Sequence, residues 1–180
     1  MRKTAKFIIA LILALILMLG FRAMVFTICT VEGDALSPLF CKGDRVLVNR
    51  WSYGLRVGSN DGLIGYTRIG RSSVSRGDIV AFENPQNTDQ VLICRCKALP
   101  GDTIEHNGQQ LVVPGLVNCA GRDYSWMQGI GTDSIADSHT LGFISEELII
   151  GRVTAIVYSH NPDAPLWRGW QHSRTLMSLQ

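Results

Sequence analysis

The chain has 180 residues, of which 18% are charged, and its formal net charge at pH 7 is +2. This mild balance excludes nucleic acid as a partner, because nucleic-acid-binding domains gather lysine and arginine on one face and no such stripe is present. The hydrophobic fraction of 46% is high for a soluble domain, and the excess lies at the N-terminus. The length suffices for one membrane anchor and one compact domain with its own core.

An unbroken apolar run extends from Phe7 to Phe21, and further apolar residues follow Arg22 up to residue 28. The run alone is short for a bilayer, which takes about 20 residues, but an arginine side chain can reach toward the headgroups and so lengthen it. Basic residues precede the run, at Arg2, Lys3 and Lys6, and they predict a cytoplasmic N-terminus. We therefore predict a basic tip and transmembrane anchor over residues 1–28 and an extracytoplasmic domain over residues 29–180.

A cleavable secretory signal is the main alternative for this segment. Such a signal ends in a small-x-small cleavage site, whereas the stretch 20–23 contains bulky Phe21 and charged Arg22. A lipoprotein signal ending at Cys29 is disfavoured as well, because residues 25–28 lack the small residue expected before the cysteine. An uncleaved anchor is the better interpretation.

The chain contains an odd number of cysteines: Cys29, Cys41, Cys94, Cys96 and Cys119. Outside the cytoplasm this leaves at least one thiol free or bonded to another chain, and the sequence does not define the pairing. Cys94-x-Cys96 is not a metal-binding spacing and the four histidines are scattered, so we expect no metal and no cofactor. Cys94 and Cys96 are instead predicted to be small buried side chains on one face of a strand.

Short apolar runs separated by turn sequences predict a mainly β domain. The expected strands cover residues 45–48, 79–82, 91–99, 103–106, 109–113 and 148–158. Asn107-Gly108 is a strong hairpin signal between two of them. Residues 53–75 and 118–140 are predicted to be long irregular stretches. The aromatic and basic segment 165–170 packs on the domain or touches a membrane surface.

Three Gly-Asp turns precede or follow these strands, at Gly43-Asp44, Gly77-Asp78 and Gly101-Asp102. In such a turn glycine supplies a positive φ and the aspartate carboxylate accepts a hydrogen bond from the nearby backbone. Each turn alone is ordinary, but their order along the chain is informative.

Five motifs follow the apolar run: Ala35-Leu36-Ser37-Pro38, then residues 43–49, 76–82, 94–102 and 137–143. Together they resemble the Ser-Met-x-Pro, Gly-Asp-x-Val-x-Val-Asn, Arg-Gly-Asp-Ile-Val-x-Phe, Lys-Arg-x-x-Gly-x-Pro-Gly-Asp and Asp-Ser-Arg boxes of bacterial type I signal peptidases (leader peptidases). The resemblance runs from about residue 21 to residue 158. It implies an antiparallel β domain behind one N-terminal transmembrane helix in the bacterial inner membrane, and the removal of signal peptides from exported proteins.

The family's mechanism uses a serine nucleophile and a neutral lysine as general base. Ala35 stands at the nucleophile position, and a methyl group cannot attack a carbonyl. Cys94 stands at the base position, where a thiol cannot imitate a neutral amine. Gly33, at the oxyanion position, has no hydroxyl to donate, as in other branches of the family. Ile135 replaces the serine that holds the lysine, and Ser134 could substitute for it only if the loop shifts.

The resemblance leaves two structural residues at the site, Arg95 and Asp137, which occupy positions that pair in the family. His139 replaces the family's second arginine. A Cys94 thiolate beside His139 would be an alternative nucleophile, and an active signal peptidase with such an unorthodox site is our alternative interpretation. A purely structural membrane protein is a third. We favour a non-catalytic paralogue with membrane lipid as one partner, and signal peptides, preproteins or an active signal peptidase as others.

Overall fold

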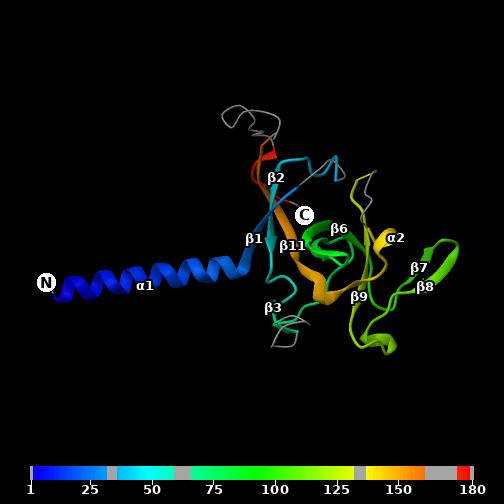
Figure 1. Cartoon of the computed structure of the whole chain (residues 1–180), viewed down its shortest axis with the longest axis horizontal. Coiled ribbons are helices and arrows are strands. Elements are labelled where there is room, and N and C mark those ends of the chain that lie inside the picture. The colour runs from blue at the N-terminus through cyan, green and yellow to red at the C-terminus, as the bar shows by residue number, and fades with distance from the viewer. Residues whose placement is uncertain (1, 32–35, 59–65, 132–136, 161–173, 179–180) are drawn as a thin grey trace.

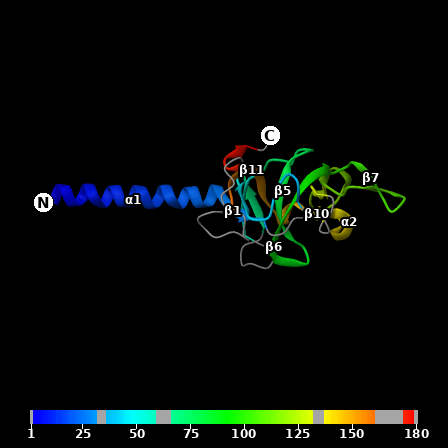
Figure 2. The same ribbon diagram turned by 90° about the horizontal axis from the view of Figure 1, so that it is seen from above.

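The computed structural model describes residues 2–31, 36–58, 66–131, 137–160 and 174–178. An N-terminal helix, α1 (Arg2–Val25), leads directly into a strand, β1 (Phe26–Thr30). Figures 1 and 2 show α1 projecting away from a β domain that contains the rest of the described chain. Large apolar side chains of α1 between Phe7 and Leu19 are exposed around the whole helix. Within the described residues, no helix combines the length and hydropathy needed to cross a membrane.

One eight-stranded sheet forms the body of the domain, in the order β1-β2-β11-β5-β6-β9-β10, with β12 paired to β11. Every pairing in it is antiparallel, which confirms the mainly β, antiparallel prediction. The strands after β1 are β2 (Asp44–Asn49), β5 (Ile79–Asn84), β6 (Asn87–Ala98), β9 (Tyr124–Gln128), β10 (Ile144–Ser145), β11 (Ile149–Ser159) and β12 (Met177–Ser178).

Two small hairpins flank the sheet: β3 (Leu55–Val57) with β4 (Thr67–Ile69), and β7 (Thr103–His106) with β8 (Gln109–Val112). The second turns at Asn107-Gly108, where both residues have positive φ, so the hairpin prediction is confirmed. Figures 1 and 2 place this hairpin at the end of the domain opposite α1. Short helical turns complete the fold: η1 (Leu116–Asn118), α2 (Ser138–Leu141) and η2 (Glu146–Leu148).

The two predicted irregular stretches are partly regular. The stretch 53–75 contains the β3–β4 hairpin, and the stretch 118–140 contains β9 and the start of α2. These strands have three to five residues each, so their alternation is too short to stand out in the sequence. β9 is fixed by pairing with β6 and by burial of Trp126 and Met127. The segment 165–170 lies outside the described residues.

The central strands are buried on both faces, so the domain has two main core clusters. Along β5, Ile79 and Ala81 belong to the first cluster, and Val80 and Phe82 belong to the second. Because successive strand residues point to opposite faces, the two clusters lie on opposite sides of the sheet. The strand carrying Cys94 therefore has apolar packing on either side.

The three Gly-Asp turns share one geometry, as predicted. The φ angles of Gly43, Gly77 and Gly101 are 90°, 89° and 88°. In each turn the aspartate carboxylate accepts a hydrogen bond from the backbone N–H three residues earlier, at 2.9, 3.0 and 2.7 Å. Each turn thus ends one strand or starts the next with a backbone N–H group paired to its aspartate.

Candidate functional site

Cys94, at the predicted general-base position, lies in the middle of β6 opposite Val80 in β5. Its side chain is 1% exposed, and Cys96 on the same face belongs to the same core cluster. The prediction of two small buried side chains on one strand face is therefore confirmed. None of the five cysteines, all within the described ranges, forms a disulfide bond.

The Cys94 thiol has little acid–base or nucleophilic capacity. Burial, and then the nearby negative charge of Asp137, raise its pKa to about 12. The thiol is therefore protonated at neutral pH, and it is the thiolate that acts as a nucleophile. A protonated thiol is also not a base, so neither role of the family's lysine is available to this side chain.

Asp137 is a buried cap for the short helix α2. Its carboxylate accepts hydrogen bonds from the backbone N–H groups of His139, at 2.9 Å, and Gly129, at 3.3 Å. The Arg95 side chain is exposed on β6, and no ion pair joins it to Asp137 among the described residues. The pairing expected from the resemblance is therefore not formed among the described residues, and the carboxylate accepts from backbone donors.

The His139 ring belongs to an aromatic cluster that connects α2 to the β7–β8 hairpin. Its centroid lies 5.4 Å from that of Trp126 and 5.5 Å from that of His106. Trp126 also contacts Phe143 edge-on at 5.4 Å. These contacts hold the hairpin against the body of the domain. They assign His139 a packing role on the hairpin side.

Three of the predicted site positions, Gly33, Ala35 and Ile135, lie outside the described residues, as does Ser134. Both ends of the segment that carries Ala35 are well fixed. Before it, the Val31 N–H donates to the Asp44 carbonyl at 2.8 Å. After it, Leu36 packs against the first core cluster, on the opposite side of the sheet from Cys94.

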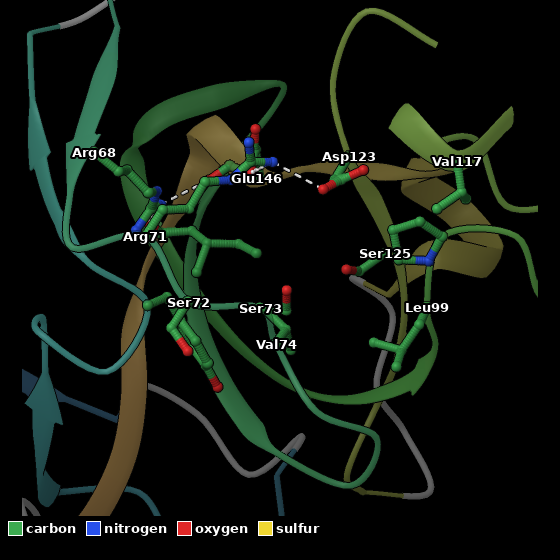
Figure 3. A pocket seen from close by; sticks show the side chains of 13 residues that line it. Arg68, Arg71, Ser72, Ser73, Val74, Leu99, Val117, Asp123, Ser125 and Glu146 are labelled. Carbon is green, nitrogen blue, oxygen red and sulfur yellow. Dashed lines mark hydrogen bonds and ion pairs between the residues drawn. The ribbon is translucent and has the colours of Figure 1, made fainter. Parts of the chain in front are cut away.

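A cavity of about 260 Å³ lies between the β3–β4 hairpin and the chain around β9, and the sequence did not reveal it. One wall carries Arg68 and Arg71, and Figure 3 shows Ser125, Leu99 and Val117 on the opposite side. Tyr53 also lines it, and its hydroxyl donates to Asp78 at 2.9 Å. Both arginines fall in a stretch that we predicted to be an irregular loop, where nothing indicates what they contact.

The charged side chains that line this cavity all have hydrogen-bond partners. Arg71 reaches Asp123 and Glu146, at 2.8 Å each, as the dashed lines in Figure 3 show. Arg68 donates to the backbone carbonyls of Gly54, Glu146 and Ile149. No histidine or lysine is among the described residues that line it, so its serine hydroxyls have no side-chain base beside them. The arrangement stabilises the β3–β4 hairpin.

Comparison with known proteins identifies the family. The pattern described as "Signal peptidase, peptidase S26" matches residues 4–125, about two thirds of the chain. The chain belongs to the signal peptidase S26 family. The match spans the chain from α1 to the start of β9, and this range includes four of the five motifs found in the sequence, at residues 35–38, 43–49, 76–82 and 94–102.

Relatives within the S26 family include both proteases and a protein named as inactive. Mitochondrial inner membrane protease subunit 2 of Mus musculus is 29% identical over 73% of this chain and 66% of its own length. Signal peptidase I V of Bacillus subtilis is 31% identical over 58% of this chain and 51% of its own length. Inactive signal peptidase IA of Staphylococcus aureus is 33% identical over 48% of this chain and 52% of its own length. The chain thus spans about half to two thirds of the length of these relatives.

Proposed function

We propose that this chain is a non-catalytic S26-family protein, attached to a membrane by α1, which binds extended peptides of exported proteins or an active signal peptidase. The observation that carries the proposal is the chemistry of Cys94. A buried thiol whose pKa is about 12 replaces the family's general base, and it cannot accept a proton from a nucleophile at neutral pH. Alanine at position 35, where the resemblance expects the serine nucleophile, has no hydroxyl to attack a carbonyl.

Peptide binding does not require either of these side chains. β1 is the first strand of the sheet, and on its outer side no strand pairs with it among the described elements. The Val31 N–H points toward β2, where it donates to Asp44 at 2.8 Å. Because backbone groups alternate in an antiparallel pair, the N–H of Thr30 points outward, to the open edge. An extended peptide can add to such an edge through main-chain hydrogen bonds.

Attachment to a membrane is supported by the surface of α1. Its apolar side chains are exposed on all sides of the helix, which is the pattern of a helix surrounded by lipid or buried in protein. Basic residues before the run favour a cytoplasmic N-terminus and an extracytoplasmic β domain. In this arrangement α1 forms the anchor, and the peptide-binding domain begins with β1 at Phe26, three residues before the boundary expected from the sequence.

A preprotein assay tests the loss of catalysis. The detergent-solubilised full chain is incubated with a preprotein and the products are separated by mass. We expect no cleavage above that of the buffer alone, since loss of a nucleophile alone can cost roughly 10⁶ in turnover. Cleavage that disappears in Cys94→Ser would show an active enzyme with an unorthodox site and contradict the proposal.

Titration with a fluorescent signal peptide tests the binding function. Thr30→Pro removes one outward N–H at an edge position that tolerates proline, and we expect it to weaken peptide binding. Thr30→Val keeps the backbone donor at similar volume and serves as the matched control. Equal affinity of both variants and the unchanged chain would rule out binding at the β1 edge. Absence of any peptide binding by the unchanged chain would favour a purely structural protein.

A further inference from the structure

The end of α1 is fastened to the turn that follows β2. The backbone N–H of Arg50 donates to the carbonyl of Val25, the last residue of α1, at 2.8 Å. Gly151 of β11 packs directly beneath this turn: a Cβ there would lie 2.3 Å from the Asn49 carbonyl oxygen and 2.9 Å from the Arg50 Cα. Glycine is therefore required at position 151, and the backbone of Arg50 is held at the level where the helix leaves the domain.

A small cavity of about 180 Å³ opens beside this junction, and Arg50 is one of its walls. The residues around it come from β1, β3, β5, β6 and β11: Thr27, Cys29, Arg56, Glu83, Val91 and Ile150. The guanidinium of Arg56 is held by Glu83 at 2.7 Å and by the Glu147 carbonyl at 2.9 Å. By contrast, the half-buried side chain of Arg50 makes no ion pair or hydrogen bond within the described part of the chain.

Within the described residues, the cavity therefore carries one positive charge without a counter-charge, since Glu83 neutralises only one of its two arginines. Burial raises the pKa of the Cys29 thiol, so this neighbour stays neutral and supplies no counter-charge. A half-buried guanidinium favours an anionic ligand such as a carboxylate or a phosphate group. Arginine binds a phosphate group through two parallel N–H···O hydrogen bonds.

Exposed apolar side chains lie near the cavity; those of β1 project from the strand face opposite Thr27 and Cys29, which line it. Phe26 and Ile28, on the outer face of β1, are 40% and 55% exposed, and Trp51, next to Arg50, is 45% exposed. Tryptophan beside arginine is typical of the boundary between lipid chains and headgroups. The exposed apolar surface continues from α1 onto β1, so the cavity lies where the apolar surface of the helix ends.

We propose that this cavity binds the phosphate of an anionic phospholipid headgroup, and that Arg50 is the residue that contacts it. The proposal rests on the membrane attachment of α1, because that attachment brings headgroups to the level of the junction. The lipid phosphate neutralises Arg50, and Trp51 and Phe26 lie among the upper parts of the lipid chains. The headgroup thereby fixes how the β domain stands on the membrane.

Lipid retention by the full chain tests this site. Native mass spectrometry is applied to the detergent-solubilised chain with added phosphatidylglycerol, or with phosphatidylcholine for comparison. We expect one retained phosphatidylglycerol, and we expect Arg50→Gln to weaken its binding about five-fold, since one basic residue near anionic lipid is worth about 1 kcal/mol. Arg50→Lys, which keeps the charge, should restore part of the retention.

Arg45→Gln is the matched control, because it removes the same charge from β2, the strand that ends just before Arg50. Arg45 is exposed at the other end of β2, where it lies over the Tyr158 ring, about 16 Å along the strand from Arg50. We expect no change in retention for this variant. Equal losses of lipid retention in Arg45→Gln and Arg50→Gln would show that only the net charge of the chain matters, and would overturn the proposed site.

Two further readouts separate the possible failures. Displacement of the lipid by millimolar inorganic phosphate would identify free phosphate as the occupant and overturn the lipid assignment. Membrane fractionation of Arg50→Gln tests the attachment independently. If the variant stays in the membrane but loses no lipid, the site is wrong and the attachment stands; if the unchanged chain leaves the membrane fraction, the attachment itself is wrong.

Discussion

Arg174 and Asp44 form an ion pair between the C-terminal end of the described chain and the turn that starts β2. The Arg174 guanidinium donates to the fully buried Asp44 carboxylate at 2.8 Å and to the Leu39 carbonyl at 2.7 Å. Leu39 belongs to the segment that directly follows Ala35. Arg174 therefore fixes both the start of β2 and the segment after Ala35, although it lies 130 positions from Asp44 in sequence.

Replacing Arg174 with leucine is expected to destabilise the domain by roughly 3 kcal/mol, because the buried Asp44 carboxylate loses its counter-charge. Denaturant unfolding of the full chain in mild detergent measures the change. Arg76→Leu is the control: Arg76 pairs with Asp102 at an exposed position, and such pairs contribute less than about 1 kcal/mol. A loss for Arg174→Leu no larger than for Arg76→Leu would show that the buried pair adds no stability.

The pH dependence of stability should report on Asp44. Burial alone would raise the pKa of this carboxyl, but hydrogen bonds from Arg174, the Cys41 backbone and Ser159 outweigh burial and lower it. A lowered pKa in the folded state stabilises the fold above the unfolded pKa of about 4, and this contribution is lost as pH falls through the folded value. We expect Asp44→Asn to be less stable than the unchanged chain at pH 7, by about 2 kcal/mol.

Unfolding curves at pH 7, 5 and 3 check this expectation. The stability gap between Asp44→Asn and the unchanged chain should remain constant from pH 7 to 5 and narrow below pH 4. Asp89→Asn, at an exposed position of β6, is the control for general charge effects. A gap that stays constant down to pH 3 would contradict the lowered pKa.

Thiol labelling should distinguish Cys94 from Cys119. Cys94 is buried with a pKa of about 12, whereas Cys119 is exposed. With a maleimide reagent at pH 7.5, we expect rapid modification of Cys119 and none of Cys94 until denaturant is added. Peptide mapping by mass spectrometry locates the label. Modification of Cys94 in the folded chain at a rate near that of Cys119 would revive a catalytic role for this thiol.

Gly151→Ala is expected to destabilise the domain by about 1–3 kcal/mol, as overpacking a well-packed site does. The added Cβ would meet backbone atoms of Asn49 and Arg50, which cannot move without disturbing the β2–β11 pairing. Gly121→Ala is the matched control, because a Cβ at Gly121 meets nothing within 4 Å. Thermal unfolding of both variants measures the difference. Equal midpoints would show that the turn at Arg50 can shift freely.

Local patterns predicted much of the fold. The six predicted strands all form, because each is an apolar run bounded by turn residues such as Gly77-Asp78. Burial of Cys94 and Cys96 followed from their position in such a run. β9 was missed because its burial depends on β6, which is distant in sequence. The partners of Arg68 and Arg174 were invisible for the same reason, since backbone carbonyls and a distant carboxylate leave no sequence pattern.

The candidate site was also only partly predictable from the sequence. The motifs indicated which residues replace the family's nucleophile and base, but not that the Asp137 carboxylate accepts from backbone N–H groups and makes no ion pair with Arg95. The partner of the Asp137 carboxylate depends on the start of α2, where the backbone N–H of His139 needs an acceptor. The surroundings of Arg50 were also unpredictable, because the residues that meet beside it come from five strands that are distant in sequence.

In each of the three Gly-Asp turns, the aspartate carboxylate makes one contact within the turn and another with a residue distant in sequence. Within the turn, the carboxylate accepts from a backbone N–H three residues earlier. Beyond it, the same carboxylates bind Arg174, Tyr53 and Arg76. Asparagine at these positions keeps an oxygen that accepts the hydrogen bond within the turn, but it removes the negative charge from the contact with the distant side chain. Such a domain can therefore lose its long-range side-chain contacts one at a time while the strands stay in place. Its sequence can accumulate substitutions at these positions without losing the fold.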